Sequence, residues 1–313
     1  MTIHDRVDIG MPILNGEKTV KRALESLLNQ SHENIHIHIS DNGSSDRTLE
    51  LIQQAAQADA RITVYEGEKG SSADNFRFVL NSSSSNFFMW AADDDKWHPD
   101  FIRVGLEKLL AGFDYFTPNW WVGDIDTNRG FNTVVHPLEF IEQGDSTSRL
   151  LNFLNLHHLS HKCNLVYSLF KTQQLKACLE TQSIDNDGAL AALIVHRLLG
   201  KCDNQLFFWK EGHDWRSAGK IKRAKIRIKT SLVSLLAGKG HAGKSFEEVK
   251  RTALERLVTL FPEFPNTLNF LFSQYQRWPK DDTMRICSSY SDLRDLAAFE
   301  INERDDRGLA TYE

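Results

Sequence analysis

The chain lacks any long run of hydrophobic residues. A helix that crosses a membrane needs about 18 or more consecutive apolar residues, and no stretch of this sequence approaches that length. The first five residues also lack the pattern of a secretory signal peptide. We therefore expect a cytoplasmic protein that has no membrane-spanning segment.

Cysteine is scarce, and its spacing is uninformative. The four cysteines, Cys163, Cys178, Cys202 and Cys287, include no CxxC pair. This spacing indicates neither a zinc site nor a disulfide framework. We expect reduced and mostly buried thiols.

The charge of the chain is unevenly distributed. Of 313 residues, 41% are hydrophobic and 25% are charged, which suits one large domain or one domain with an appendage. The net charge is -5, yet residues 216–313 hold 18 Lys and Arg against 13 Asp and Glu. We expect a catalytic domain over residues 1–215 and a helical region over residues 216–313. Its basic start, Lys220–Lys229, suits a peripheral contact with anionic lipids at the inner face of the membrane, or a solvated helix face. We expect no nucleic-acid partner.

Strand-like and helix-like segments alternate four times in the first hundred residues. Residues 7–14 form an apolar run that predicts a buried strand. Apolar residues at helical spacing follow, and residues 35–40 then alternate as a half-buried strand does. The pattern repeats with residues 62–65 and with residues 87–91. Such a rhythm predicts a mostly parallel sheet covered by helices, in which the loops after the strands form the ligand site. The residues of the first predicted helical face are Val20, Ala23, Leu24, Leu27 and Leu28.

Polar residues follow three of these predicted strands. Asn15 follows the first, Asp41 the second, and the triplet Asp93, Asp94 and Asp95 the fourth. A cluster of carboxylates repels itself unless a cation or donors compensate it, and hard divalent cations prefer oxygen ligands. The alternative is a solvated loop, with Asp41 forming a turn. The HxH pair of residues 36 and 38 also shares one strand face, although metal binding there is not favoured.

The ordered set of motifs resembles the family 2 glycosyltransferases. The segments that carry the resemblance are residues 12–15, residues 29–31, residues 41–48, Gly70 with Ala73 and Asn75, and the Asp triplet with Trp97 and Pro99. The resemblance implies an α/β GT-A fold, which is a Rossmann-like and mostly parallel sheet sandwiched by helices, here with a helical C-terminal appendage. It further implies an inverting enzyme that moves a sugar from a UDP-sugar to a hydroxyl of a glycan or glycolipid, as in polysaccharide biosynthesis.

The resemblance also assigns roles on the donor side. Pro12, Asn15 and Asp41 would line the nucleoside pocket, where a carboxylate would accept from the uracil imide N–H. Asn75, and with it Lys69, would lean toward the phosphates or lie on a helix surface. Within the triplet, Asp93 and Asp94 would contact the donor, and Asp95 with Asp93 would hold Mn²⁺ or Mg²⁺. Many relatives carry a further Asp where this chain has Ala92, which leaves open which carboxylate binds the metal.

The acceptor side should supply a general base. Asp185 and Asp187 precede an apolar helical segment, residues 189–194, which ends near Gly200. This arrangement resembles the family's acidic residue at the start of a helix, and it favours Asp187 over Asp185 as the base, with helix capping as the alternative. The resemblance makes His213 a third metal ligand. It also predicts a strand over residues 164–170 beside the acceptor, where Trp120 and Trp121 would stack on a sugar or pack in the core.

Two short motifs in the tail, residues 216–313, suggest other functions. Residues 238–245 match the P-loop pattern of an NTPase, but helix-like sequence follows them and no strand supplies a Walker-B carboxylate. Residues 274–278 match the QxxRW signature of processive polysaccharide synthases, whose membrane helices this chain lacks. The pattern also admits a GT-A-like nucleotidyltransferase or a catalytically silent sugar-binding protein. The glycosyltransferase interpretation explains the order of the motifs best.

Overall fold

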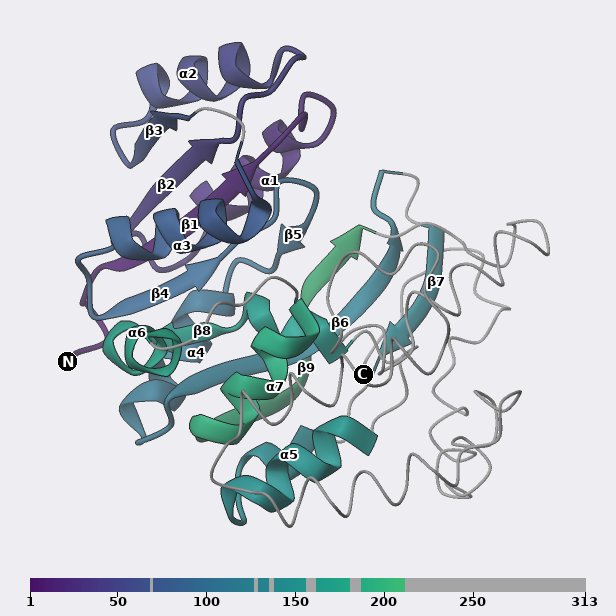
Figure 1. Ribbon diagram of the computed structural model, residues 1–313. Coiled ribbons are helices and arrows are strands. Elements are labelled where there is room, and N and C mark those ends of the chain that lie inside the picture. The colour runs from purple at the N-terminus through teal and green to yellow at the C-terminus, as the bar shows by residue number, and fades with distance from the viewer. Residues whose placement is uncertain (68–69, 127–128, 135–137, 156–161, 181–186, 212–313) are drawn as a thin grey trace.

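A computed structural model describes residues 1–67, 70–126, 129–134, 138–155, 162–180 and 187–211 (Figure 1). The predicted helical region over residues 216–313, its basic start and both tail motifs lie outside these residues. So do Lys69, Asp185, His213 and Cys287, whereas Cys163, Cys178 and Cys202 are free thiols. Within the described part, no helix is both long enough and apolar enough to cross a bilayer.

A single mixed sheet organises the described residues. Its strands follow the order β3-β2-β1-β4-β8-β6-β9-β5, and β7 pairs with β6. The first four neighbours, β3 to β4, are parallel. Strand β8 is then antiparallel to both β4 and β6, and β9 runs parallel to β6 but antiparallel to β5. The strands are β1 (Val7–Ile13), β2 (Ile35–Asp41), β3 (Ile62–Glu66), β4 (Phe87–Trp90), β5 (Lys96–Trp97), β6 (Tyr115–Asp124), β7 (Arg129–Val134), β8 (Leu169–Lys171) and β9 (Gly200–Glu211).

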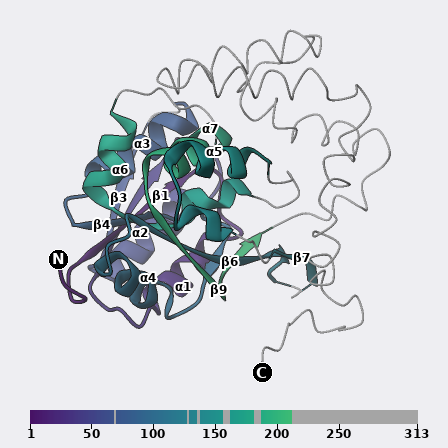
Figure 2. The ribbon, with the colours of Figure 1, turned by 90° about the horizontal axis from the view of Figure 1, so that it is seen from below.

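Helices cover both faces of this sheet. Figures 1 and 2 show α3, α5, α6 and α7 on one face, and α1 and α4 on the other. Helix α2 packs against α1, β2 and β3. The helices are α1 (Val20–Leu28), α2 (Thr48–Ala58), α3 (Ser72–Ser82), α4 (Phe101–Leu110), α5 (Ser146–Asn155), α6 (Thr172–Leu179) and α7 (Asp187–Arg197), with 3₁₀ turns η1 (Leu138–Ile141) and η3 (Lys162–Tyr167).

The hydrophobic pattern of the first half explains its elements. Helix α1 buries Val20, Ala23, Leu24 and Leu27, which recur at helical spacing and form one apolar face. Strand β2 was expected to be half-buried, but only His36 in it is partly exposed. A parallel strand with neighbours on both sides and helices on both faces is buried throughout, which explains the difference.

One prediction for the second half is wrong, and one pair of alternatives is decided. The expected strand over residues 164–170 is mostly the 3₁₀ turn η3, and strand β8 begins only at Leu169. The hydroxyl of Ser168 donates to the carbonyl of Leu165 at 2.7 Å, which closes this turn. A short apolar run fits either a buried strand or a buried turn, so its pattern could not decide. Trp120 and Trp121 are buried in β6 and are core residues.

Candidate active site

The loops that follow β1 and β2 are tied together by Asn15. This residue has φ of +56°, in the left-handed region that Asn tolerates better than most residues. Its side-chain Oδ1 accepts from the backbone N–H of Ser45 at 2.9 Å. Its own N–H donates to the Ser44 hydroxyl, also at 2.9 Å. The exposed Asn15 therefore fixes the rim that the sequence assigned to a nucleoside pocket.

Asp41 lies at the end of β2, directly opposite Ile13 of β1. Its carboxylate is buried and accepts from the backbone N–H of Ser44 at 3.0 Å and from the Ser44 hydroxyl. These bonds form a turn at the strand end. They leave lone pairs on the carboxylate, because each of its oxygens can accept more than one hydrogen bond.

Asn75 and Pro12 flank the same edge of the sheet. Asn75 is buried in α3, and its side-chain amide donates to the carbonyl of Ser40 at 3.0 Å, which holds α3 against β2. Pro12 is half-buried and lies beside Ser40 in the register of β1 and β2. Strand β4 pairs with β1 only as far as Gly10, so Pro12 lies beyond the stretch of β1 that has partners on both sides.

Asp93 packs against the first turn of the β1–α1 loop. A Cβ added to Gly16 would lie 2.2 Å from Asp93 Oδ2, so a side chain at position 16 would displace the Asp93 carboxylate. The Thr19 hydroxyl donates to the same oxygen at 3.4 Å. Burial, together with the neighbouring Asp94 carboxylate, raises the pKa of Asp93 to about 6. A cation at Asp93 and Asp94 would relieve that repulsion.

Asp95 has a different environment. It is fully buried, and Lys210 Nζ donates to its Oδ2 at 2.9 Å, while the backbone N–H of Glu211 donates to its Oδ1 at 3.0 Å. Asp94 is 40% exposed, with Oδ1 at 3.5 Å from the same Lys210 Nζ. Burial lowers the pKa of the Lys210 ammonium, but the Asp95 carboxylate raises it above its usual range. We therefore assign a charged Lys210.

Arg22 links this cluster to α1. Its Nη2 donates to the backbone carbonyl of Asp94 at 2.6 Å and to Glu211 Oε2 at 3.0 Å. Its Nη1 pairs with Asp126. A cation on α1 therefore fixes the backbone of the Asp triplet and the end of β9.

The structure supports a divalent cation at Asp93 and Asp94 better than at Asp95. Asp94 is partly exposed and repels the Asp93 carboxylate, so this pair suits an incoming cation, whereas Asp95 is fully buried against the Lys210 ammonium. No group of three or more His, Cys, Asp or Glu side chains suited to a metal ion occurs among residues 1–211 that the structure describes. The pair that shares a strand face, His36 and His38, bonds instead to Thr63 and Tyr65.

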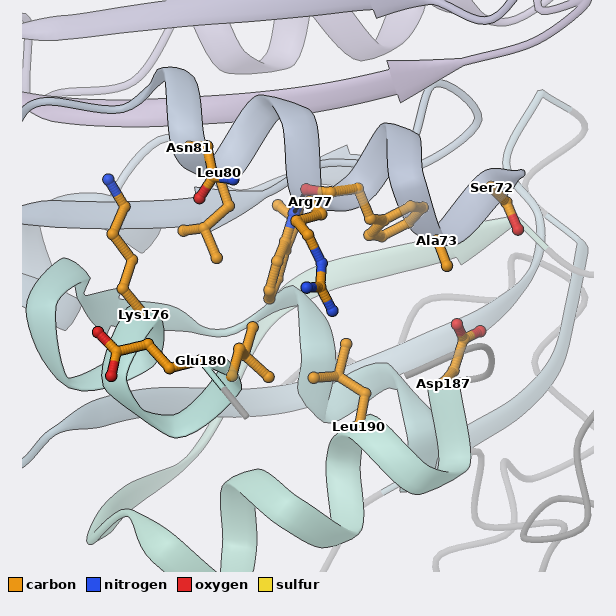
Figure 3. A pocket seen from close by; sticks show the side chains of 12 residues that line it. Ser72, Ala73, Arg77, Leu80, Asn81, Lys176, Glu180, Asp187 and Leu190 are labelled. Atoms are coloured by element: carbon orange, nitrogen blue, oxygen red, sulfur yellow. Dashed lines mark hydrogen bonds between the residues drawn. The ribbon is translucent and has the colours of Figure 1, made fainter. Parts of the chain in front are cut away.

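Asp187 is the first residue of α7 and is exposed. A carboxylate here interacts favourably with the positive end of the helix dipole. Figure 3 shows it pointing across a cavity toward α3, with Arg77 of α3 between the two walls. The cavity has a volume of about 360 Å³ and is lined by Ser72, Ala73, Phe76, Arg77, Leu80, Asn81, Trp90, Lys176, Leu179, Glu180, Asp187 and Leu190.

Tyr167 connects Asp187 to the Asp triplet. Burial raises the pKa of its phenol above the usual range, and the charges that act on this phenol are those of Lys210, Asp187, Asp95 and Asp94. Lys210 Nζ lies 5.1 Å from the centre of the Tyr167 ring, within the range of a cation–π contact. Tyr167 therefore lies within electrostatic range of the predicted base and of two of the predicted donor-side carboxylates.

Sequence reasoning did not single out Arg22 or Tyr167 as parts of this site, and it noted a basic residue before His213 without pairing Lys210 with Asp95. Lys210 lies 115 residues after Asp95, and no local motif marks the pairing. The sequence pattern of residues 205–213 suits a strand that runs into a loop and carries a basic residue, but only the register of β5 and β9 brings Lys210 to Asp95.

A family model described as "Glycosyl transferase family 2" matches residues 8–169, which is just over half of the chain. Two bacterial glycosyltransferases are among its relatives. Glycosyltransferase GlyA of Streptococcus pneumoniae is 26% identical over 110 residues, which cover 35% of this chain and 16% of GlyA. The GalNAc(5)-diNAcBac-PP-undecaprenol beta-1,3-glucosyltransferase of Campylobacter jejuni is 24% identical over 116 residues, covering 36% of this chain and 38% of that enzyme. The chain thus spans less than half the length of either relative.

The backbone is also similar to solved structures. TarS 1–349 of S. aureus, crystallised in complex with UDP-GlcNAc, superposes with a TM-score of 0.52 at 14% sequence identity. The match covers 85% of this chain and 83% of TarS 1–349. At this identity the likeness shows the fold, which is the one that the order of strands and helices predicts.

Proposed function

The chain belongs to the family 2 glycosyl transferases and has the GT-A fold, and on that premise we propose that it is an inverting enzyme that transfers a sugar from a UDP-sugar to an acceptor hydroxyl. The observation that supports the proposal is the packing of Lys210 against Asp94, Asp95 and the ring of Tyr167, with Asp187 within electrostatic range of the same Tyr167. A general base and a donor-binding cluster in one site suit group transfer between two bound substrates.

The donor binds where the loops after β1, β2 and β4 meet. Asp41 accepts from the imide N–H of uracil through the lone pairs that Ser44 leaves available. Asn15 and Pro12 complete the nucleoside pocket, and Asn75 holds α3 beside the phosphates. The UDP-GlcNAc complex of the structurally similar TarS supports a UDP-sugar as the donor.

Asp93 and Asp94 would hold Mn²⁺ or Mg²⁺, with His213 as a further ligand. When bound, this cation supplies positive charge to the diphosphate of the donor. Arg22 holds the Asp94 backbone in place through its bond to the carbonyl. Glycine at position 16 allows the Asp93 carboxylate to lie against the β1–α1 loop.

Asp187 acts as the general base. It accepts the proton of the acceptor hydroxyl as the oxygen attacks the anomeric carbon from the face opposite UDP, which inverts the configuration at that carbon. Asp185, two residues earlier in the chain, is the alternative base. The cavity beside Asp187 is lined by six apolar and six polar or charged residues, a mixture that suits an organic ligand with polar groups.

The acceptor is a glycan or a glycolipid. The name of the C. jejuni relative includes a polyprenyl-diphosphate glycan, which supports a lipid-linked acceptor. Such an acceptor would bring the protein to the inner face of the membrane, where Lys220–Lys229 would contact anionic headgroups.

Calorimetry with UDP, GDP and ATP, each with and without Mn²⁺, tests the proposal. We expect UDP to bind most tightly and Mn²⁺ to strengthen its binding, with both effects reduced in Asp41→Asn and Asp93→Asn. Tight ATP binding that disappears in Lys244→Ala would instead support an NTPase in the tail and overturn the proposal.

A further inference from the structure

The ammonium of Lys210 lies between two carboxylates of the Asp triplet. Its Nζ is 2.9 Å from Asp95 Oδ2 and 3.5 Å from Asp94 Oδ1. Asp95 is fully buried, and the Lys210 side chain is only 20% exposed. A monovalent cation that is part of the chain therefore occupies the space beside Asp94 and Asp95.

The fold holds Lys210 firmly in this position. Strand β9 pairs antiparallel with β5, which places Trp209 opposite Lys96. Lys96 directly follows Asp95 in the chain, and Lys210 directly follows Trp209, so the pairing brings Lys210 next to Asp95. The backbone N–H of Glu211 then bonds to the second Asp95 oxygen. The ring of Tyr167, 5.1 Å away, stabilises the ammonium from another side. Lys210 is thus positioned by backbone pairing as well as by its charge.

This arrangement gives the three carboxylates different uses. Asp95 is fully buried, and its oxygens accept from Lys210 and from Glu211, so a metal ion bound to it would lie directly beside the Lys210 ammonium. Asp94 is partly exposed, and its contact with Lys210 is the longer of the two. A divalent ion that approaches Asp94 therefore meets a positive charge already in place, which opposes its binding.

Building on the proposed function, we propose that Lys210 is a built-in cation of the Asp94–Asp95 pair and limits the affinity of the site for a divalent ion. Asp95 holds Lys210 rather than the metal. Asp93 and Asp94 remain as the carboxylates that a divalent ion uses, and it binds there against the charge of Lys210. Lys210 also gives the site a positive charge before any metal binds.

The affinity for Mn²⁺ in the absence of nucleotide tests this proposal. Calorimetry and the Mn²⁺-dependent rise in melting temperature would be measured for the wild type, Lys210→Gln and Lys210→Arg. We expect Lys210→Gln to bind Mn²⁺ at least tenfold more tightly than the wild type, because it removes the charge but keeps a donor for Asp95. Lys210→Arg keeps the charge and should bind as the wild type does. Unchanged or weaker Mn²⁺ binding by folded Lys210→Gln would overturn the proposal.

A double variant covers the case in which Lys210→Gln does not fold. Replacing both members of a buried ion pair is tolerated far better than removing one, so Asp95→Asn with Lys210→Met should fold. We expect it to bind Mn²⁺ more tightly than the wild type, since Asp93 and Asp94 remain and the ammonium is gone. Weaker binding would identify Asp95 as the metal ligand and contradict the proposal.

UDP binding by the same variants separates this proposal from the proposed function. If none of them binds UDP under any condition, the proposed function fails, whereas the Mn²⁺ affinities still decide the role of Lys210. If UDP binds but the Mn²⁺ affinity does not depend on Lys210, the proposal about Lys210 fails alone.

Discussion

The two halves of the described sheet are built in different ways. In the first half, β1 to β4 are parallel, and a helix follows each strand before the next begins, so each loop at the edge comes from one short piece of sequence. In the second half, β8 separates β4 from β6 and β9 separates β6 from β5. That topology brings Lys210 to Asp95 across 115 residues. The residues of the proposed donor site thus come from short local segments, whereas the pairing of Lys210 with Asp95 depends on long-range strand order.

The largest expected effect concerns the base in the second half. Asp187→Asn should lower the transfer rate about 10³-fold, within the range of a lost general base, and leave UDP affinity within about twofold. The rate of UDP release would measure the transfer rate, and calorimetry would measure the affinity for UDP. Asp74→Asn is the matched control, because Asp74 lies in the first turn of α3 as Asp187 does in α7. If both substitutions lower the transfer rate only slightly and by the same factor, Asp187 only stabilises the start of α7 and is not the base.

The next effect concerns the long-range pairing itself. Lys210→Met leaves the buried Asp95 without its cation, which should reduce the free energy of unfolding by about 3–5 kcal/mol. Denaturant unfolding would measure the loss. Adding Asp95→Asn to Lys210→Met should restore most of the stability. Failure of the second change to restore it would show that the pair is not the cause.

The stability of the first half at low pH should depend on Asp8 of β1. Burial alone would raise its pKa, but His38, the Ser84 N–H and Arg6 hold the pKa well below its usual range. Ionised Asp8 therefore stabilises the fold above the unfolded pKa of about 3.9, and this contribution is lost as the pH falls further, through the folded pKa. Asp8→Asn should lower the free energy of unfolding by about 2 kcal/mol at pH 7. Below pH 4, the melting temperature of this variant should depend less on pH than that of the wild type. An unchanged acid dependence would contradict this account.

The smallest effect concerns the loop of Asn15. Asn15→Ala should cost about 1–2 kcal/mol, because alanine resists the left-handed conformation at φ of +56°. Asn15→Gly accepts that conformation and loses only the bond from Ser45, so it should cost less. Thermal unfolding of the two variants would compare them. Equal losses for the two variants would show that the lost hydrogen bond, rather than the backbone conformation, decides the effect.

The first half could be predicted from the sequence because its signals are local. The spacing of Val20, Ala23, Leu24 and Leu27 indicated α1, and polar residues after apolar runs indicated the edge of the sheet. Asp46 shows the same local logic, because it lies just before α2 and accepts from the N–H of Thr48, the first residue of that helix.

The second half carried weaker signals. The apolar run at Leu165 and Val166 is typical of a strand as well as of the buried turn that it forms. Strand order cannot be read from periodicity, so neither the pairing of β9 with β5 nor the place of Lys210 was predictable. The close packing of Gly200 is equally invisible in the sequence: a Cβ there would lie 2.3 Å from the Tyr115 ring.

The most direct test of the central claim is the configuration of the sugar that the enzyme first releases. UDP-glucose, UDP-galactose and UDP-GlcNAc, which are α-linked donors, would be screened for slow hydrolysis in the presence of Mn²⁺, with the anomeric proton followed by NMR. The account predicts that the β anomer forms first from at least one donor, and that Asp187→Asn abolishes it without abolishing UDP binding. Initial formation of the α anomer, or an undiminished rate in Asp187→Asn, would contradict it.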